Sequence, residues 1–192
     1  MVQKEKKYKW RRENYAEQTR GLLIVHTGNG KGKTTAALGL LMRAAGRGLK
    51  CCMIQFMKSR HDRYGEHVAA EKLGIEVHTM GDGFTWDTKN PEQDRQTARN
   101  TWELCLEKLR SANYQLIVLD ELVYVMSYKM LPVEEVLEEF RQVRESQPSL
   151  HIVVTGRDAP EALVEAADLV TEMREIKHPF TAGIRAQQGI EF

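Results

Sequence analysis

The sequence predicts an α/β fold in which about six strands form a mostly parallel sheet with helices on both faces. Three observations lead to this prediction. Short apolar runs alternate with longer amphipathic runs, a glycine-rich loop joins the first apolar run to a helix, and a later apolar run ends in two acids. Alternation of this kind produces parallel strands that bind ligands beyond their carboxyl ends.

Composition and charge indicate one globular domain. The chain has 192 residues, of which 42% are hydrophobic and 29% charged, with a net charge of +1 that gives no global case for a nucleic-acid partner. We expect a polar arm or helix at residues 1–20 and the α/β domain at 21–192. The arm is basic, so both a solvated, frayed segment and a nucleic-acid tail stay open. The sequence contains neither a membrane span nor a signal peptide, which predicts a cytoplasmic protein without a membrane partner.

The glycine-rich loop at residues 28–35 has the features of a phosphate site. It follows an apolar strand at 22–25 and leads into a helix at 33–47. The N–H groups of such a loop cradle phosphate at the positive end of the helix. Lys33 would supply a charge to the phosphate oxygens, and the Thr34 hydroxyl would ligate Mg²⁺ held by the nucleotide.

This loop departs from the usual phosphate-loop (P-loop) pattern at its entry. The first glycine of G-x-x-x-x-G-K-[ST] would fall at position 27, where this chain has Thr27, and the nearest glycine is Gly28. A glycine-rich turn that binds no ligand is therefore the alternative.

The next segment adds two strands and a helix. Residues 49–56 (LKCCMIQF) form an apolar strand, residues 66–73 a helix and residues 75–80 a further strand. Because side chains alternate along a strand, Cys51 and Cys52 point to opposite faces, and we expect both to be buried apolar residues rather than metal ligands.

A polar loop at residues 81–91 then carries two large aromatics, Phe84 and Trp86. An exposed aromatic pair in a loop marks a ligand or partner surface. Packing of both rings onto the core is the alternative.

The second half continues the alternation. A helix at 93–110 has apolar residues at helical spacing, and the apolar strand at 114–121 ends in Asp120 and Glu121, where a carboxylate can hold Mg²⁺ directly or through water. We expect a helix opening at Leu131, a strand at 150–155, a helix at 159–167, a strand at 169–173 and an irregular tail at 177–192. Five residues that follow strands should gather at one sheet edge: Gly28, Lys58, Phe84, Glu121 and Arg157.

The chemistry of these residues leaves two functions open. The sequence offers a phosphate cradle and a magnesium site, but no Ser–His or Cys–His pair stands out and its six histidines are scattered. Either the protein is an ATPase or switch that hydrolyses the γ-phosphate, or it is a transferase whose nucleophile belongs to the other substrate.

Six motifs together resemble one enzyme family. GNGKGKTTAALG, QFMK, GFTWDT, VLDELVY, VVTGRD and KHPFTAG…AQQGIEF are similar to the P-loop corrinoid adenosyltransferases, ATP:cob(I)alamin or cob(I)yrinic acid a,c-diamide adenosyltransferase, from about Gly21 to Phe192. The resemblance implies a P-loop NTPase-like (RecA-like) fold and transfer of the 5′-deoxyadenosyl group of ATP to Co(I), with release of tripolyphosphate, in adenosylcobalamin biosynthesis or salvage. The nucleotide of this family lies reversed relative to P-loop hydrolases.

The resemblance also implies roles for individual residues. Lys33, Phe84, Trp86 and Glu121 would be catalytic, with the aromatic pair displacing the lower ligand of the corrin, and Thr34 and Glu121 would hold Mg²⁺. The implied nucleotide contacts are Asn29, Gly30, Lys31, Gly32, Lys33, Thr34, Thr35 and Arg157. Lys177 and His178 are further candidate contacts to the nucleotide or corrinoid.

Cofactors and partners follow from the same resemblance: Mg²⁺, ATP, cob(I)alamin or a precursor corrinoid, a reduced flavoprotein as electron donor, and a second subunit in a homodimer. The choice among cobalamin, cobinamide and the a,c-diamide stays open. The rival functions are a RecA-like ATPase that hydrolyses the γ-phosphate and a non-catalytic switch or corrinoid carrier.

Overall fold

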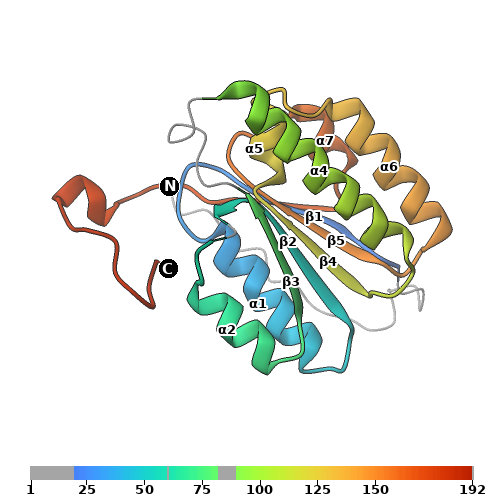
Figure 1. The fold of residues 1–192 in the computed structure, drawn as a ribbon, viewed down its shortest axis with the longest axis horizontal. Coiled ribbons are helices and arrows are strands. Elements are labelled where there is room, and N and C mark those ends of the chain that lie inside the picture. Colours follow the sequence, from blue (N-terminus) through green and yellow to red (C-terminus); the bar gives the residue numbers. More distant parts are fainter. Residues whose placement is uncertain (1–19, 60, 82–89, 192) are drawn as a thin grey trace, which may run out of the picture.

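The strands form one parallel sheet, as Figure 1 shows for the computed structural model, which describes residues 20–59, 61–81 and 90–191. Its six strands lie in the order β3-β2-β4-β5-β1-β6, and every pairing between them is parallel. The predicted sheet is therefore confirmed, and it is parallel throughout the described part. The strands are β1 (Leu23–Thr27), β2 (Cys51–Ser59), β3 (Glu76–Gly81), β4 (Leu116–Asp120), β5 (His151–Thr155) and β6 (Leu169–Glu172).

The direction of the chain across the sheet decides which face each helix covers. The connections β1 to β2 and β2 to β3 run toward the β3 edge of the sheet. The connections β3 to β4, β4 to β5 and β5 to β6 run toward the β6 edge. Because such crossovers are right-handed, the two sets of helices lie on opposite faces. One face carries α1 (Lys33–Ala45) and α2 (Gly65–Lys72), and the other carries α4 (Pro91–Arg110), α5 (Leu122–Ser127), α6 (Val133–Ser146) and α7 (Glu161–Ala166) (Figure 1).

Each face of the sheet has its own apolar core. Cys51 is buried with Leu41 on the α1 side, while Cys52 is buried with Cys105 and Trp102 on the α4 side. The expectation that the adjacent cysteines point to opposite faces as buried apolar residues is confirmed, and all three cysteines are free thiols.

Helix α5 and the start of α4 differ from the prediction. Helix α5 was not expected, because its residues Leu122, Val123, Val125 and Met126 are all buried and leave no amphipathic pattern. Helix α4 starts at Pro91 rather than residue 93, since the Asn90 side chain accepts a hydrogen bond from the Gln93 N–H and caps it.

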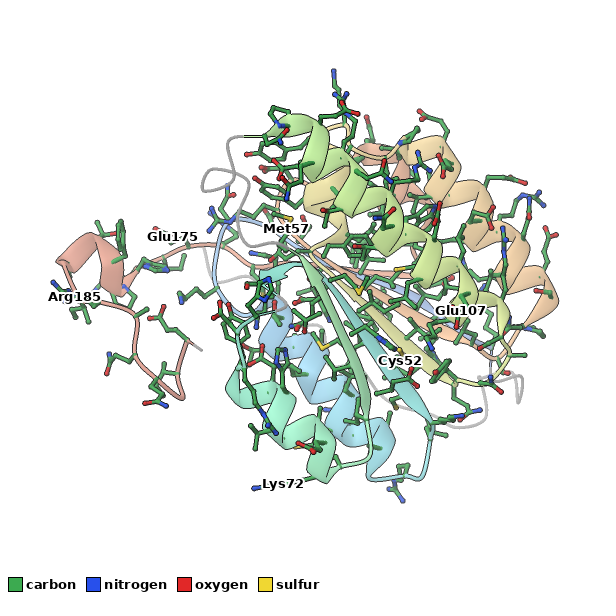
Figure 2. The ribbon with its side chains drawn as sticks, viewed as in Figure 1. Cys52, Met57, Lys72, Glu107, Glu175 and Arg185 are labelled. Carbon is green, nitrogen blue, oxygen red and sulfur yellow. The ribbon has the colours of Figure 1, made fainter. Side chains whose placement is uncertain are left out.

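Beyond β6, residues 173–191 form a segment that we call the C-terminal arm. It contains one 3₁₀ turn, η2 (Pro179–Ala182), in a tail that was expected to be irregular. Figure 1 shows the arm standing away from the sheet and its helices, and Figure 2 shows Glu175 and Arg185 on this projecting part. No helix in the described ranges has the length and hydropathy needed to cross a membrane.

Candidate functional site

The loop after β1 is wrapped around the ammonium group of Lys33. Lys33 Nζ donates hydrogen bonds to the carbonyl oxygens of Gly28 (2.7 Å) and Gly30 (2.9 Å) and is buried. Gly32 precedes α1 with φ 114° and has no side chain to cap the helix, so the first N–H groups of α1 stay available to an anion. The loop therefore brings a fixed cation and a helix N-terminus to one point.

The start of the C-terminal arm holds the loop in this shape. The Gly30 N–H donates to the Met173 carbonyl at 2.7 Å, and the Met173 N–H donates to the Thr27 carbonyl at 2.8 Å. A Cβ atom on Gly28 would lie 2.5 Å from the Met173 oxygen, so only glycine permits this approach. The loop is thus seated against backbone that lies about 145 residues further along the chain.

Thr27, which stands where the usual motif has glycine, links the loop to another connection. Its hydroxyl oxygen accepts a hydrogen bond from the Ala159 N–H at 3.1 Å, just before α7. The side chain is buried. The departure from the motif therefore ties β1 to the segment that follows β5.

Asp120 is the carboxylate that lies beside Thr34. It ends β4 and is 1% exposed, and its Oδ1 accepts hydrogen bonds from the hydroxyls of Thr34 (2.9 Å) and Thr155 (2.8 Å). Its Oδ2 accepts a longer bond from Gln55 at 3.3 Å. Sequence reasoning had named the neighbouring Glu121 as the magnesium ligand. A signal for Asp120 was present, because strand alternation places it on the face of Val118, under α1.

Glu121 occupies a left-handed backbone conformation directly after the strand. Its φ and ψ are 62° and 21°, and its N–H donates to the Thr155 hydroxyl at 2.9 Å. A non-glycine residue held in this region costs about 1 kcal/mol or more and often occurs at functional sites. Gly156, which follows β5, lies close to this residue. A Cβ on Gly156 would lie 3.3 Å from Glu121 Oε2 and 2.6 Å from Val123 Cβ.

The groups around Glu121 have opposite effects on the pKa of its carboxyl group. Burial, and secondly the Asp120 carboxylate, raise the pKa of Glu121 to about 7, while the charges of Lys33 and Arg157 lower it. Burial likewise lowers the pKa of Lys33, against the pull of Glu121. Arg157 is exposed yet acts on both groups, so the structure brings these three predicted site residues together.

Lys58 is a further cation at this edge of the sheet, where the sequence had placed it without assigning it a role. It lies near the end of β2, pairs with Glu66, and has its ammonium 4.5 Å from the centre of the Tyr64 ring. Burial lowers its pKa, whereas the charges of Asp120 and Glu121 raise it. The signal was Gln55 and Lys58 themselves, polar residues in a strand that is otherwise apolar as far as Met57.

Of the other predicted residues, some are exposed and some lie in the C-terminal arm. Lys31 is exposed and pairs with Glu191 of the C-terminal arm. Asn29 and Thr35 are exposed, at the loop and the start of α1. Lys177 and His178 lie in the arm, where His178 Nδ1 accepts a hydrogen bond from the Phe180 N–H. Phe84 and Trp86 lie outside the described residues, as do residues 1–19 of the predicted arm.

The donor set fits a nucleotide with its magnesium ion. Thr34 and Asp120 offer a hydroxyl and a carboxylate, the hard oxygen ligands that Mg²⁺ prefers, next to the buried Lys33 and the free N-terminus of α1. The site lies at the carboxyl ends of parallel strands, where ligands of such folds bind. The fold and this site define a P-loop nucleotide-binding protein.

Comparison with known proteins gives the family. Residues 19–192 match the profile of ATP:corrinoid adenosyltransferase BtuR/CobO/CobP. The chain is 41% identical over 177 residues to the corrinoid adenosyltransferase of Escherichia coli strain K12, spanning 92% of this chain and 88% of that protein. It is 43% identical over 177 residues to that of Sinorhizobium sp, spanning 90% and 81%. The chain belongs to this family, and it is an ATP-dependent corrinoid adenosyltransferase, as its motifs predicted.

A solved structure supports the fold alone. The flagellar accessory protein FlaH from Methanocaldococcus jannaschii superposes with a TM-score of 0.57 over 80% of this chain and 71% of FlaH, at 11% identity. The P-loop NTPase-like (RecA-like) fold predicted from the sequence is therefore confirmed.

The raised pKa of Glu121 predicts how the free energy of unfolding of the protein, measured without nucleotide or Mg²⁺, depends on pH. Because its folded-state pKa of about 7 exceeds the ordinary value of 4.5, the folded protein binds more protons between these values, and the stability due to Glu121 falls as pH rises through this window. Glu121→Gln should therefore raise the free energy of unfolding at pH 8, by up to about 3 kcal/mol, and change it little at pH 4. Urea unfolding of both proteins across this range measures the difference, and a difference independent of pH would contradict the prediction.

Proposed function

We propose that this protein transfers the 5′-deoxyadenosyl group of ATP to the Co(I) ion of a corrinoid and releases tripolyphosphate, in adenosylcobalamin biosynthesis or salvage. The observation that carries the proposal is the loop built around Lys33, with Thr34 beside Asp120, in a chain of the ATP:corrinoid adenosyltransferase family.

The protein's part in this reaction is to hold the triphosphate and stabilise its departure. The electron pair of Co(I) forms the bond to C5′ of ATP, and the C5′–O bond breaks with its electrons leaving on tripolyphosphate. Charge on that leaving group is stabilised by the Lys33 ammonium and by the N–H groups at the start of α1, which are in place before the reaction. Since Co(I) is itself a strong nucleophile, the step needs no protein base.

The magnesium ligands proposed here come from two elements. The Thr34 hydroxyl and the Asp120 carboxylate would hold the ion, with Glu121 next to them as the ligand expected from the sequence. When bound, Mg²⁺ would neutralise charge on the phosphate chain. The hydrogen bonds that Asp120 accepts from Thr34, Thr155 and Gln55 orient its carboxylate.

The corrinoid is proposed to lie at the same sheet edge. The segment that contains Phe84 and Trp86 leaves at the end of β3 (Gly81) and rejoins at the start of α4 (Pro91), so both of its attachment points lie at or near the carboxyl edge of the sheet. Aromatic rings against one corrin face would exclude water and an axial donor, which favours the lower-charged cobalt state. Arg157 and Lys58 are the further cations available to the substrates there.

The proposal includes a reduced flavoprotein as electron donor and a homodimer, and the cytoplasm stays the location predicted from the sequence. The alternative, hydrolysis of the γ-phosphate by a RecA-like ATPase, uses the same loop but is not favoured by the family match. A nucleotide-dependent switch or corrinoid carrier would bind without turnover.

One anaerobic experiment tests the function. Purified protein is mixed with chemically reduced cob(I)alamin, ATP and Mg²⁺, and the corrin absorbance and phosphate products are followed. We expect light-sensitive adenosylcobalamin and tripolyphosphate. ADP and phosphate without a corrinoid change would support the ATPase, and binding without any product would support the switch or carrier.

Paired substitutions test which carboxylate holds Mg²⁺. The Thr34 hydroxyl bonds directly to Asp120. We therefore expect Asp120→Asn to raise the Mg²⁺ concentration that half-saturates adenosylation at least tenfold more than Glu121→Gln does. The half-saturating Mg²⁺ concentration at fixed ATP measures this difference. A larger effect of Glu121→Gln would return the principal role to the residue that the sequence named.

The aromatic pair is tested by the double variant Phe84→Ala/Trp86→Ala. We expect loss of adenosylation by at least a hundredfold with the affinity for MgATP unchanged, because the rings are proposed to act on the corrinoid alone. The control is Leu49→Ala/Leu73→Ala, which truncates two exposed apolar side chains that precede β2 and β3 at the opposite edge of the sheet. Normal adenosylation by the aromatic variant would rule out the proposed role.

A further inference from the structure

A row of polar side chains crosses the α1 face of the sheet and ends at His67 of α2. In the strand register, Gln55 of β2 lies between Thr79 of β3 and Asp120 of β4, so these side chains share one face of the sheet. Gln55 is 0% exposed. His67 lies in the first turn of α2, and its Nε2 is 2.7 Å from Gln55 Oε1. The row therefore connects α2 to the carboxylate that bonds to Thr34.

Two observations place the proton of the His67 ring on Nε2. The backbone N–H of Tyr64 donates a hydrogen bond to His67 Nδ1 at 3.3 Å, and a nitrogen that accepts such a bond carries no proton. Burial lowers the pKa of His67, and the charges of Lys58 and Arg63 lower it further, which favours the neutral ring. A neutral imidazole has one N–H group, and that group is consequently Nε2–H.

This proton decides which way the Gln55 amide points. Gln55 Oε1 faces the N–H group of His67 and accepts a further hydrogen bond from the Thr79 hydroxyl at 3.1 Å. Because both neighbours donate, the carbonyl oxygen belongs on this side and the NH₂ group on the other. The NH₂ group then donates to Asp120 Oδ2 at 3.3 Å. A flipped amide would bring two oxygens together at that contact with no proton between them.

The two oxygens of Asp120 are held in different ways. Its Oδ1 accepts hydrogen bonds from the hydroxyls of Thr34 and Thr155, whereas its Oδ2 accepts one from the Gln55 amide. Bonds at one oxygen alone let the plane of the carboxylate turn about that oxygen. The contact at Oδ2 therefore fixes the orientation of the carboxylate beside Thr34.

We propose that His67 is a positioning residue of the magnesium site: its Nε2–H orients the Gln55 amide, and this amide holds the Asp120 carboxylate in place beside Thr34. The inference rests on the proposed role of Thr34 and Asp120 as magnesium ligands, on which His67 acts through Gln55. Groups that orient a metal ligand from behind commonly change metal affinity by about 10- to 100-fold. A smaller effect is expected here, because the Thr79 hydroxyl also holds Gln55 Oε1.

The state of the ring is tested on the wild-type protein without ligands. A long-range ¹H–¹⁵N correlation spectrum near neutral pH distinguishes a protonated ring nitrogen from an unprotonated one. We expect His67 to be neutral, with its proton on Nε2. A proton on Nδ1, or on both nitrogens, would overturn the proposal, and this measurement stands even if a variant fails to fold.

Two substitutions of His67 test its effect on Mg²⁺. A glutamine at this position of a helix can accept from the Tyr64 N–H and offer an N–H to Gln55, whereas a leucine can do neither. Calorimetry measures ATP binding as a function of Mg²⁺ concentration. We expect His67→Leu to raise the half-saturating Mg²⁺ concentration by at least about threefold, and His67→Gln to stay within about twofold of wild type. An unchanged value for His67→Leu, or no rescue by His67→Gln, would contradict the proposal.

A double-mutant cycle separates positioning from capping, since His67→Leu also removes the bond from the Tyr64 N–H at the start of α2. Because His67 acts through Gln55, His67→Leu should have little further effect on the half-saturating Mg²⁺ concentration in a Gln55→Met background, less than about 1.5-fold. Loss of the helix cap would have the same effect in both backgrounds, and that result would rule out positioning through Gln55.

These measurements do not depend on the reaction that follows binding. A protein that shows the expected variant effects but hydrolyses ATP without adenosylation would retain the positioning role of His67 and lose the proposed reaction. A protein that adenosylates cob(I)alamin with the same Mg²⁺ dependence in its wild-type and His67→Leu forms would retain the proposed reaction and lose the positioning role.

Discussion

The buried carboxylate of Asp120 is the group on which the arrangement of the site depends. It accepts hydrogen bonds from α1, β5 and β2 through Thr34, Thr155 and Gln55 while it belongs to β4 itself. A carboxylate that is 1% exposed is tolerated only with such partners, because an unpaired buried charge costs several kcal/mol. The same three bonds that satisfy this charge also fix the start of α1 against the middle of the sheet, and thereby the loop that precedes it.

Around Asp120 the structure concentrates charges that no single strand could bring together. Desolvation lowers the pKa values of the buried Lys33 and the partly buried Lys58, and it raises the pKa of the partly buried Glu121. Each of these groups is partly compensated by the charges of the others. A triphosphate with Mg²⁺ would bring both signs of charge to the site, and its binding would therefore complete the pairing of groups that are already in position.

The phosphate loop is held from outside as well as from within. Lys33 bonds to two loop carbonyls from inside, and Met173 contacts the loop backbone from the far end of the chain. Thr27, where the chain departs from the common motif, adds a further tertiary contact, because its hydroxyl accepts a hydrogen bond from the segment before α7. The loop is consequently shaped by tertiary contacts in addition to its glycines, and it meets the C-terminal arm directly.

The sequence by itself determined the fold class, the order of strands and helices along the chain, the phosphate loop and the family. These follow from local patterns: apolar periodicity, turn residues and the spacing of Lys33 and Thr34 within one loop. It did not reveal α5, a six-residue helix with four buried residues and therefore no amphipathic signal. It named Glu121 as the magnesium ligand, and the structure places the neighbouring Asp120 beside Thr34. Only the tertiary structure decided that the Asp120 carboxylate bonds to Thr34 of α1, and that the arm leaves the body after contacting the loop. The physical reason is that each of these depends on contacts between strands and helices far apart in the sequence, and their geometry is set by how the sheet is ordered and covered.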